Sequence, residues 1–419
     1  MPDQPVSAKT VPTYAAAFRC IGASCEDPCC GDWNIPLDKA TYDYYQQFPL
    51  NKLGSVVQNF VFLEDTAAAA QGTYAQIHRT PSGPCPFFDS DRLCSIQREY
   101  GPRLLSATCS IYPRSLSRVN GELEGSLSLS CPEAARNILL VPDFMQVEGD
   151  LNSGDFRTDN FFQLRNSSTH KPHAFFHALR TLLIEVVRDR SRPIWQRLLL
   201  IGLLCKRLEE TTATAGDEAV PALLADFRQF LESKDLHTEF KNMPGSLRIK
   251  LEVVLGLTNE RVQDTRGNRF RDTFWNFVEG IGSPIGSMPG DDIERFQHAE
   301  ENYHRPFLER SPFILENYLL NYIVQNLFPF GREGSAQFIP RSMFEEWILM
   351  TTQFAWINAL LIGISGHYKE SFAEEHVVST IQSFTRAVEH YPAVLNSIIE
   401  YMKLRKLNTF QGMAIMLKN

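Results

Sequence analysis

Eight of the nine cysteines of this 419-residue chain fall within its first third, and four of those lie within eleven residues. The eight are Cys20, Cys25, Cys29, Cys30, Cys85, Cys94, Cys109 and Cys131. Thiolates are soft ligands that select zinc or iron–sulfur clusters. Disulfides or buried thiols are the alternative, but a chain of this length buries enough apolar surface to fold without covalent staples. We therefore interpret the eight thiols as metal ligands.

The spacing of these thiols leaves the identity of the metal open. The run Cys20-x4-Cys25-x3-Cys29-Cys30 is neither the paired C-x2-C of zinc ribbons nor the C-x2-C-x2-C run of bacterial ferredoxins. Adjacent Cys29 and Cys30 do not easily point the same way, so we expect one of them to pack or to belong to a second site. Eight thiols suffice for one four-iron cluster with spares or for two sites, and the sequence does not choose between them.

Three residues close to the thiols are candidates for contact with a cofactor: Trp33, Tyr112 and Arg114. Aromatic rings provide the low-dielectric surroundings that tune a metal centre, and they suit an ordinary core equally well. Arg114 suits either an anionic cofactor group or an acidic neighbour. The chain has no G-x-G-x-x-G after a predicted strand and no Walker loop, so a conventional nucleotide-binding loop is not indicated. The sequence identifies no catalytic residue.

Two other groups of residues have weaker claims to chemistry. His170, His173 and His177 have helical spacing and would form a second metal or proton-transfer face. No carboxylate or thiol accompanies them at ligand spacing, so we expect a half-exposed first helical turn instead. Cys205 stands alone on an apolar helix face, where we expect a buried core thiol.

Turn and cap signals predict how the N-terminal part positions the thiols. Asp38 is suited to cap a helix over residues 38–45. The polar stretch at residues 89–91 predicts a tight reversal, which would bring Cys85 and Cys94 onto facing strands. The thiols would then be presented by a hairpin.

A second hairpin and a helix are predicted farther along. Asn120-Gly121 between alternating apolar and polar residues is a strong hairpin signal. Pro132 is suited to the first turn of a helix, because its missing amide hydrogen costs nothing there. Cys131 would lie at the positive end of that helix, where a thiolate is favoured.

The rest of the chain predicts helices almost throughout, after a polar, turn-rich stretch at residues 142–170 that suits a domain boundary. Apolar residues recur there at three- and four-residue spacing. The predicted helices span roughly residues 172–190, 193–211, 219–233, 245–260, 268–280, 291–304, 312–328, 342–365, 371–389 and 392–405. The expected fold class is mainly α: a small cysteine-rich α+β metal-binding domain over residues 1–150, then a large α-helical domain over residues 151–419 that is a candidate for substrate docking.

Composition narrows the choice of partner and compartment. The net charge is −8, from 41 basic and 49 acidic residues, and no long basic block is present. We therefore expect no nucleic-acid partner, because such binding needs clustered cations. The run from Leu198 to Cys205 is too short to span a membrane, and the first residues do not resemble a signal peptide. We expect a cytoplasmic protein without a membrane partner, and its oligomeric state is not indicated.

The cysteine pattern as a whole resembles the bacterial flagellin lysine-N-methylase family. The resemblance covers residues 18–137. A less complete version of the same pattern resembles a broader group of cysteine-cluster proteins that chelate zinc or iron. The family resemblance rests on Phe18-x-Cys20-x4-Cys25-x3-Cys29-Cys30-x2-Trp33, Cys85-Pro-Phe-Phe-Asp-x3-Leu-Cys94-x-Ile, Cys109-x2-Tyr-Pro-Arg114 and Leu127-x-Leu-Ser-Cys131-Pro-Glu-Ala-Ala135.

This resemblance implies methyl transfer from S-adenosylmethionine to lysine side chains of flagellin, in a protein that holds a 4Fe-4S cluster through its N-terminal cysteines. The eight thiols occupy the matching positions, and the resemblance does not say which four are ligands. A different class of function remains open beside the enzyme: a non-catalytic protein-interaction module in which zinc braces the N-terminal domain.

Overall fold

The structure is a computed structural model in which the chain divides into two compact units. Unit 1 comprises Met1–Asn137 with Asp143–Phe162, and unit 2 comprises Ile138–Pro142 with Gln163–Asn419. The described chain as a whole is mainly helical with small sheets, as the mainly α fold class predicts, and strands β1 to β5 all lie in unit 1. The structure describes residues 14–31, 34–50, 52–64, 73–79, 83–146, 157, 162–164, 170–233, 240, 242–265, 267–282, 291–332 and 339–418.

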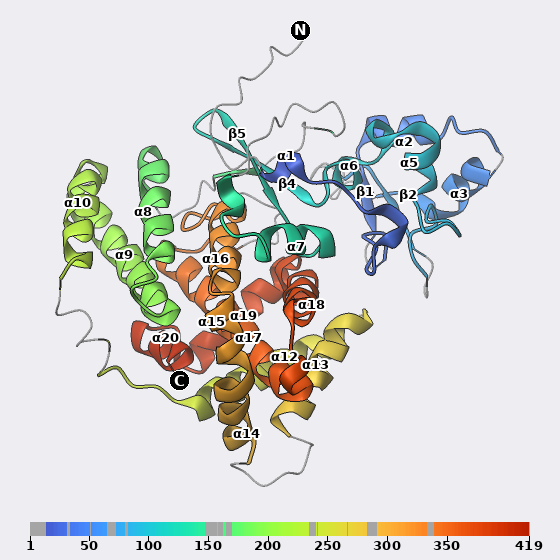
Figure 1. The fold of residues 1–419 in the computed structure, drawn as a ribbon. Helices are drawn as coiled ribbons and strands as arrows, with labels where there is room; N and C mark the ends of the chain where they lie inside the picture. The colour runs from blue at the N-terminus through green and yellow to red at the C-terminus, as the bar shows by residue number, and fades with distance from the viewer. Residues whose placement is uncertain are drawn as a thin grey trace. The chain divides into compact units, whose positions relative to one another are not determined.

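Unit 1 contains short helices and two small sheets (Figure 1). Its helical elements are α1 (Tyr14–Ala17), η1 (Gly22–Ser24), α2 (Lys39–Tyr45), α3 (Lys52–Phe60), α5 (Ser95–Tyr100), η2 (Pro102–Leu104), α6 (Ala107–Ile111), α7 (Pro132–Leu139) and η3 (Phe144–Gln146). Its strands are β1 (Ile35–Leu37), β2 (Val61–Leu63), β3 (Ala75–Ile77), β4 (Arg114–Val119) and β5 (Glu122–Leu127), with the two-residue β6 (Phe162–Gln163) at its end.

The two sheets are antiparallel where their pairing is recorded, and turn chemistry accounts for the longer hairpin. The first sheet has the order β1-β3-β2, and the second has the order β5-β4-β6. In the second sheet Arg114 pairs with Leu127 and Val119 pairs with Glu122. Asn120 (φ 50°) and Gly121 (φ 87°) form the turn, both in the left-handed region that a two-residue hairpin loop requires. The predicted Asn-Gly hairpin is therefore confirmed.

The core of unit 1 lies between its first sheet and the helices around it. The Asp38 side chain accepts a hydrogen bond from the Thr41 amide at 2.9 Å, which confirms the predicted cap of α2. Tyr45, at the end of this helix, is 1% exposed and packs among the apolar side chains of β1 and β3. Cys30, Cys94 and Cys109 pack against this same core. The sheet and α2 thus form the apolar floor beneath these three thiols.

Unit 2 is a helical array, and each of the ten predicted segments contains a helix. The predictions missed α15 and α20. The helices are α8 (Phe176–Arg188), α9 (Ile194–Ala215), α10 (Val220–Leu231), α12 (Leu247–Asp264), α13 (Asn268–Ile281), α14 (Asp291–Ala299), α15 (Arg305–Arg310), α16 (Phe313–Gln325), α17 (Met343–Tyr368), α18 (Glu374–Phe384), α19 (Pro392–Leu404) and α20 (Phe410–Leu417), with 3-10 turns η4 (His173–Phe175), η5 (Asp217–Ala219) and η7 (Lys369–Ser371) and π-helical turns η6 (Glu300–His304) and η8 (Thr385–Glu389).

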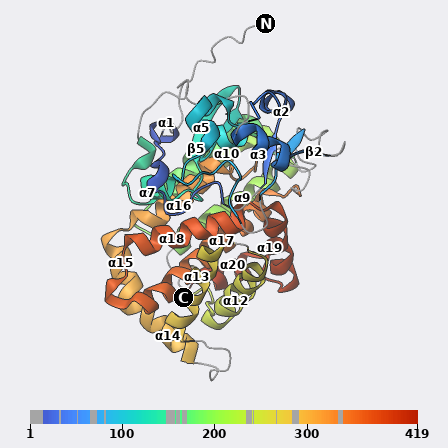
Figure 2. The same cartoon turned by 90° about the vertical axis from the view of Figure 1, so that its right-hand side faces the viewer.

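Helix α17 is the centre of unit 2, and α9, α13, α18, α19 and α20 all pack against it (Figures 1 and 2). A capping box between Ser342 and Glu345 fixes its start. Helix α13 crosses it closely, because a Cβ atom on Gly280 would lie 1.8 Å from the carbonyl oxygen of Gly363. By length and composition the segment Met343–Ser371 is apolar enough to cross a membrane, unlike the shorter run noted in the sequence, and 94% of its most apolar window is buried. Its position in the core accounts for this composition.

Candidate functional site

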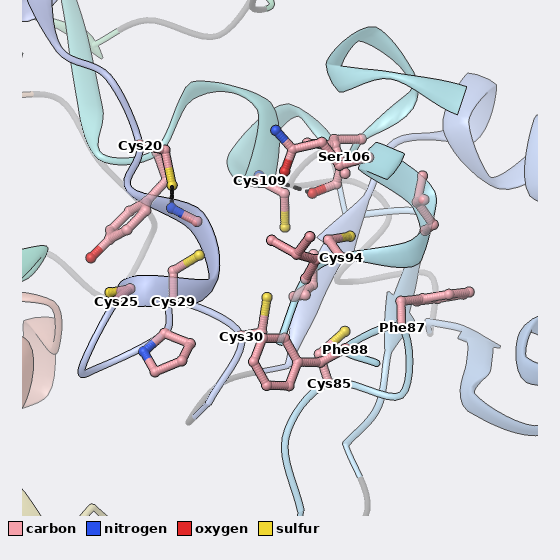
Figure 3. Close-up of a pocket in the computed structure, with 18 of the residues that line it drawn as sticks. Cys20, Cys25, Cys29, Cys30, Cys85, Phe87, Phe88, Cys94, Ser106 and Cys109 are labelled. Carbon is pink, nitrogen blue, oxygen red and sulfur yellow. Dashed lines mark hydrogen bonds between the residues drawn. The ribbon is translucent and has the colours of Figure 1, made fainter. Parts of the chain in front are cut away.

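All eight N-terminal cysteines line one cavity of about 130 Å³ in unit 1. Figure 3 shows this cavity and labels all of them except Cys131. No disulfide joins any of the nine cysteines, all of which lie among the described residues. The rings of Phe18, Phe87 and Phe88 contribute to an otherwise mostly apolar wall. The four cysteine-bearing pieces that are far apart in the sequence therefore meet around a single space.

The loop that carries the first four thiols is tied down by its backbone. Gly22 has φ +59°, a left-handed conformation that starts the 3-10 turn η1, and its amide donates to the Cys20 sulfur at 3.4 Å. The Arg79 guanidinium donates to the Gly31 carbonyl oxygen at 2.6 Å. The Cys85 amide donates to the Cys30 carbonyl oxygen at 2.7 Å. These bonds place the loop against the segment that carries the next two thiols.

The predicted hairpin between Cys85 and Cys94 is wrong in part. The reversal exists, because the Asp89 carboxylate accepts hydrogen bonds from the amides of Asp91 at 2.9 Å and Leu93 at 3.1 Å. Only one antiparallel bridge, between Phe88 and Cys94, follows from it. Helix α5 begins at Ser95, directly after Cys94, so no second strand is left for a longer ladder. Cys94 is thus a helix cap and not a strand residue.

Cys109 and Cys131 are also positioned by helix starts. The Ser106 hydroxyl caps α6 and accepts a hydrogen bond from the Cys109 amide at 3.1 Å. Cys131 directly precedes α7, whose amides at Glu133 and Ala134 lower the pKa of its thiol. Burial has the larger effect and raises that pKa to about 12. The start of α7 therefore favours a thiolate at Cys131 as expected, and burial opposes this effect more strongly.

The electrostatic coupling between the thiols sorts them into two groups. In the first, a hydrogen bond with the Cys29 side chain raises the pKa of Cys30, and burial and the charges of Cys85 and Cys109 add to this effect. Burial raises the pKa of Cys109, to which Cys29, Cys85 and Cys94 contribute. We call these residues the five-thiol group: Cys29, Cys30, Cys85, Cys94 and Cys109. In Figure 3 the sulfur atoms of Cys29, Cys30 and Cys109 point toward the same space.

The remaining thiols form a second group, Cys20, Cys25 and Cys131, which we call the three-thiol group. Burial raises the pKa of the Cys131 thiol, and the charges of Cys25 and Cys20 contribute. Burial also raises the pKa of Cys25, with a contribution from Cys20. By the largest contributions to their pKa values, the thiols of the one cavity therefore fall into these two groups.

The thiols surround a space and do not converge on a point. Within the described ranges, no three or more His, Cys, Asp or Glu side chains already form a ligand set for a single metal ion. The cavity of about 130 Å³ is roughly ten times the ~10–15 Å³ that one water molecule needs. A single zinc ion would draw its four sulfurs to about 2.3 Å from one centre. The observed arrangement offers room for a larger group.

The three cofactor candidates have different outcomes. Tyr112 lines the cavity, and its hydroxyl hydrogen-bonds with the Ser130 hydroxyl at 2.9 Å. Arg114 donates to the carbonyl oxygens of Ala15 at 2.9 Å and Phe18 at 2.8 Å, and its guanidinium lies over the Phe18 ring. It thus anchors the segment before Cys20, a role that the sequence did not suggest. Trp33 lies outside the described residues.

Four polar residues of the cavity wall were missed by the sequence reasoning: Asp27, Arg92, Gln97 and Ser106. Arg92 has φ 60°, which is unusual for a residue with a long side chain. Its guanidinium donates to the Cys25 carbonyl oxygen at 2.6 Å. Its position directly after the predicted reversal at residues 89–91, between Cys85 and Cys94, was the available signal, because a turn between two candidate ligands must border the site.

The histidines and the last cysteine lie elsewhere, in unit 2. His170 contacts Asp217 at 2.6 Å, and the Arg180 guanidinium contacts His177 at 3.2 Å. The His173 ring packs on Phe330 instead. The three rings thus contact different side chains, and no metal-ligand group is found among the described residues. Cys205 is 1% exposed on α9, which confirms the prediction of a buried core thiol.

Comparison with known proteins gives one match to a family model and matches to individual proteins. Residues 180–416 match the family model described as the FliB lysine N-methylase C-terminal domain. Over 138 residues, 32% of this chain, the sequence is 37% identical to the lysine-N-methylases of Salmonella typhimurium (strain LT2) and Salmonella choleraesuis (strain SC-B67) and to the flagellar biosynthetic protein FliU of Salmonella muenchen. The match spans 33% of each of the two methylases and 79% of FliU. No solved structure matches the chain.

Proposed function

Because this chain belongs to the FliB lysine N-methylase family, we propose that it transfers methyl groups from S-adenosylmethionine to lysine side chains of flagellin in the cytoplasm. The names of its relatives support both the reaction and the substrate in this proposal, since two are lysine-N-methylases and one is a flagellar biosynthetic protein. In such a transfer the lone pair of a neutral lysine nitrogen attacks the methyl carbon. The carbon–sulfur bond breaks toward sulfur, one proton leaves the nitrogen, and S-adenosylhomocysteine is released.

The observation that carries the proposal is the single cavity lined by all eight thiols. We propose that it holds a 4Fe-4S cluster through four members of the five-thiol group. Thiolates are the usual ligands of such clusters, and the cavity is larger than one metal ion requires. When bound, the cluster supplies a site that binds or polarises the methyl donor.

The protein residues around that space have roles that need no metal. The rings of Phe87 and Phe88 on the cavity wall exclude water, which strengthens every electrostatic interaction inside the cavity. Tyr45, beneath the thiols, donates its hydroxyl to the Leu104 carbonyl oxygen at 2.9 Å and so holds α2 against the turn that leads to α6. Unit 2, which contains the family match, is the proposed docking surface for flagellin.

Anaerobic purification tests the cluster. We expect a brown protein containing iron and inorganic sulfide, whose content falls in Cys109→Ala, because that thiol belongs to the five-thiol group. Cys205→Ala is the control: it also removes a thiol from the protein interior, but this thiol lies in unit 2, so iron and sulfide should stay at the wild-type level. Equal losses in the two variants would contradict the assignment of the cavity.

Transfer of labelled methyl groups tests the reaction. Purified protein, S-adenosylmethionine and flagellin should give labelled flagellin, and flagellin with its lysines blocked should stay unlabelled. A colourless, iron-free, zinc-loaded protein that leaves flagellin unlabelled would overturn the proposal. It would support instead the non-catalytic zinc-binding interaction module.

A further inference from the structure

The cavity wall carries one positive charge among its described residues. Thiols, apolar rings and neutral polar groups make up nearly all of the lining, Asp27 is its carboxylate, and Arg92 is its only lysine, arginine or histidine. The site becomes more negative when thiolates bind a metal, so a second anion entering the same space would be repelled unless a cation faces it. Among the described residues of the wall, only Arg92 can supply that cation.

Arg92 is held in place by backbone groups, and no ion pair joins it to an acidic side chain in the part of the chain that the structure describes. Its Nη2 atom donates to the Cys25 carbonyl oxygen at 2.6 Å, and its side chain is otherwise exposed. The Asp89 carboxylate fixes the turn on both sides of Arg92 through the amides of Asp91 and Leu93. Leu93 in turn packs beside Gly22, which has φ +59°. The guanidinium therefore lies at the rim of the cavity with further N–H donors available for a ligand.

We propose that Arg92 binds the α-carboxylate of the methyl donor, so that the donor enters the cavity with its amino-acid end at the reversal of residues 89–93. This inference rests on the proposed function. A guanidinium presents two parallel N–H donors that match a carboxylate. Binding at the rim would leave the sulfonium and the adenosyl group to the apolar wall formed by Phe87 and Phe88.

Three ligands separate this role from a structural one. S-adenosylmethionine and S-adenosylhomocysteine both carry the carboxylate, and decarboxylated S-adenosylmethionine lacks it. Equilibrium binding of each to the purified protein is measured for the wild type and for Arg92→Gln. We expect Arg92→Gln to weaken the two carboxylate ligands about tenfold to a hundredfold, the usual range for a charge-assisted hydrogen bond. Affinity for the decarboxylated ligand should not change.

Two further variants serve as controls. Arg92→Lys keeps the charge but loses the paired donors, so it should recover only part of the affinity for the two carboxylate ligands. Arg79→Gln removes another arginine that donates to a carbonyl oxygen of the same cysteine loop, but Arg79 is not part of the cavity wall. It should leave all three affinities unchanged.

The outcomes keep this inference apart from the proposed function. If the wild type binds S-adenosylmethionine and Arg92→Gln binds it equally well, the role of Arg92 is wrong and the proposed function stands. An equal loss for all three ligands would also overturn the inference, because it would mean that Arg92 only supports the loop. A wild type that binds none of the ligands overturns the proposed function and the inference together.

Discussion

We expect Glu316→Ala to destabilise unit 2 by about 3–5 kcal/mol, the usual cost of breaking a buried ion pair. The Glu316 side chain is 4% exposed and accepts hydrogen bonds from Arg197 at 3.0 Å and from Arg190 at 2.9 and 3.1 Å. Arg197 is 9% exposed, so alanine would leave a buried charge without its partner. Arg190 is 53% exposed and contributes only about 0–1 kcal/mol to the loss.

Urea unfolding followed by tryptophan fluorescence measures this loss. Four of the five tryptophans, Trp195, Trp275, Trp347 and Trp356, belong to unit 2, so their emission reports mainly on its unfolding. With a slope of about 3 kcal/mol per molar urea, the midpoint should fall by about 1 M or more. The control is Glu185→Ala, which breaks the exposed pair with Arg228 and should cost no more than about 1 kcal/mol.

The two variants and a double substitution test whether Glu316 compensates the buried charge of Arg197. If Glu316→Ala lowers the midpoint no more than Glu185→Ala does, the buried carboxylate does not compensate Arg197 and the reasoning is refuted. Replacing Glu316 and Arg197 together by methionine should recover most of the loss, because no buried charge then remains unpaired. A double variant as unstable as Glu316→Ala would point to lost packing instead.

Two further perturbations test unit 2. Gly202→Ala would place a Cβ atom 2.2 Å from the Trp347 ring, so helices α9 and α17 must shift apart. We expect the free energy of unfolding to fall by about 1–3 kcal/mol, which would lower the melting temperature. An unchanged melting temperature would show that α9 can shift without cost. Burial raises the pKa of Glu389 to about 7, although Tyr318 donates to it at 3.0 Å. The native state therefore keeps a proton that the unfolded chain has released, and stability should fall by up to about 3 kcal/mol as pH rises from 4.5, the ordinary pKa of a glutamate, to about 7. Glu389→Gln should flatten this dependence, and a urea midpoint that falls equally in both proteins would assign it to another group.

Local sequence was enough to predict those features that local hydrogen bonds decide. Asp38 caps α2 and Asn120-Gly121 turns the β4–β5 hairpin because each uses backbone groups only a few residues away. The helices of unit 2 followed from apolar spacing for a similar reason: each helix must bury one face. The predicted hairpin at Cys94 failed because helix α5 begins directly after Cys94, which leaves no second strand to pair with the first.

For the candidate site, too, some features could be predicted from the sequence and others could not. Its eight thiols were evident from the sequence, because residue types and their clustering along the chain can be read without knowing the fold. Their arrangement was not: the five-thiol and three-thiol groups arise from contacts between segments up to about a hundred residues apart, which no spacing rule records.

The sequence by itself therefore determined which side chains are available for chemistry and which segments are helical. Only the tertiary structure decided that the thiols surround one cavity, that Arg92 is the cation on its wall, and that Arg114 serves the backbone beside it. The physical reason is that burial and electrostatic coupling depend on what lies nearby in space. Those neighbours are set by the packing of the whole unit.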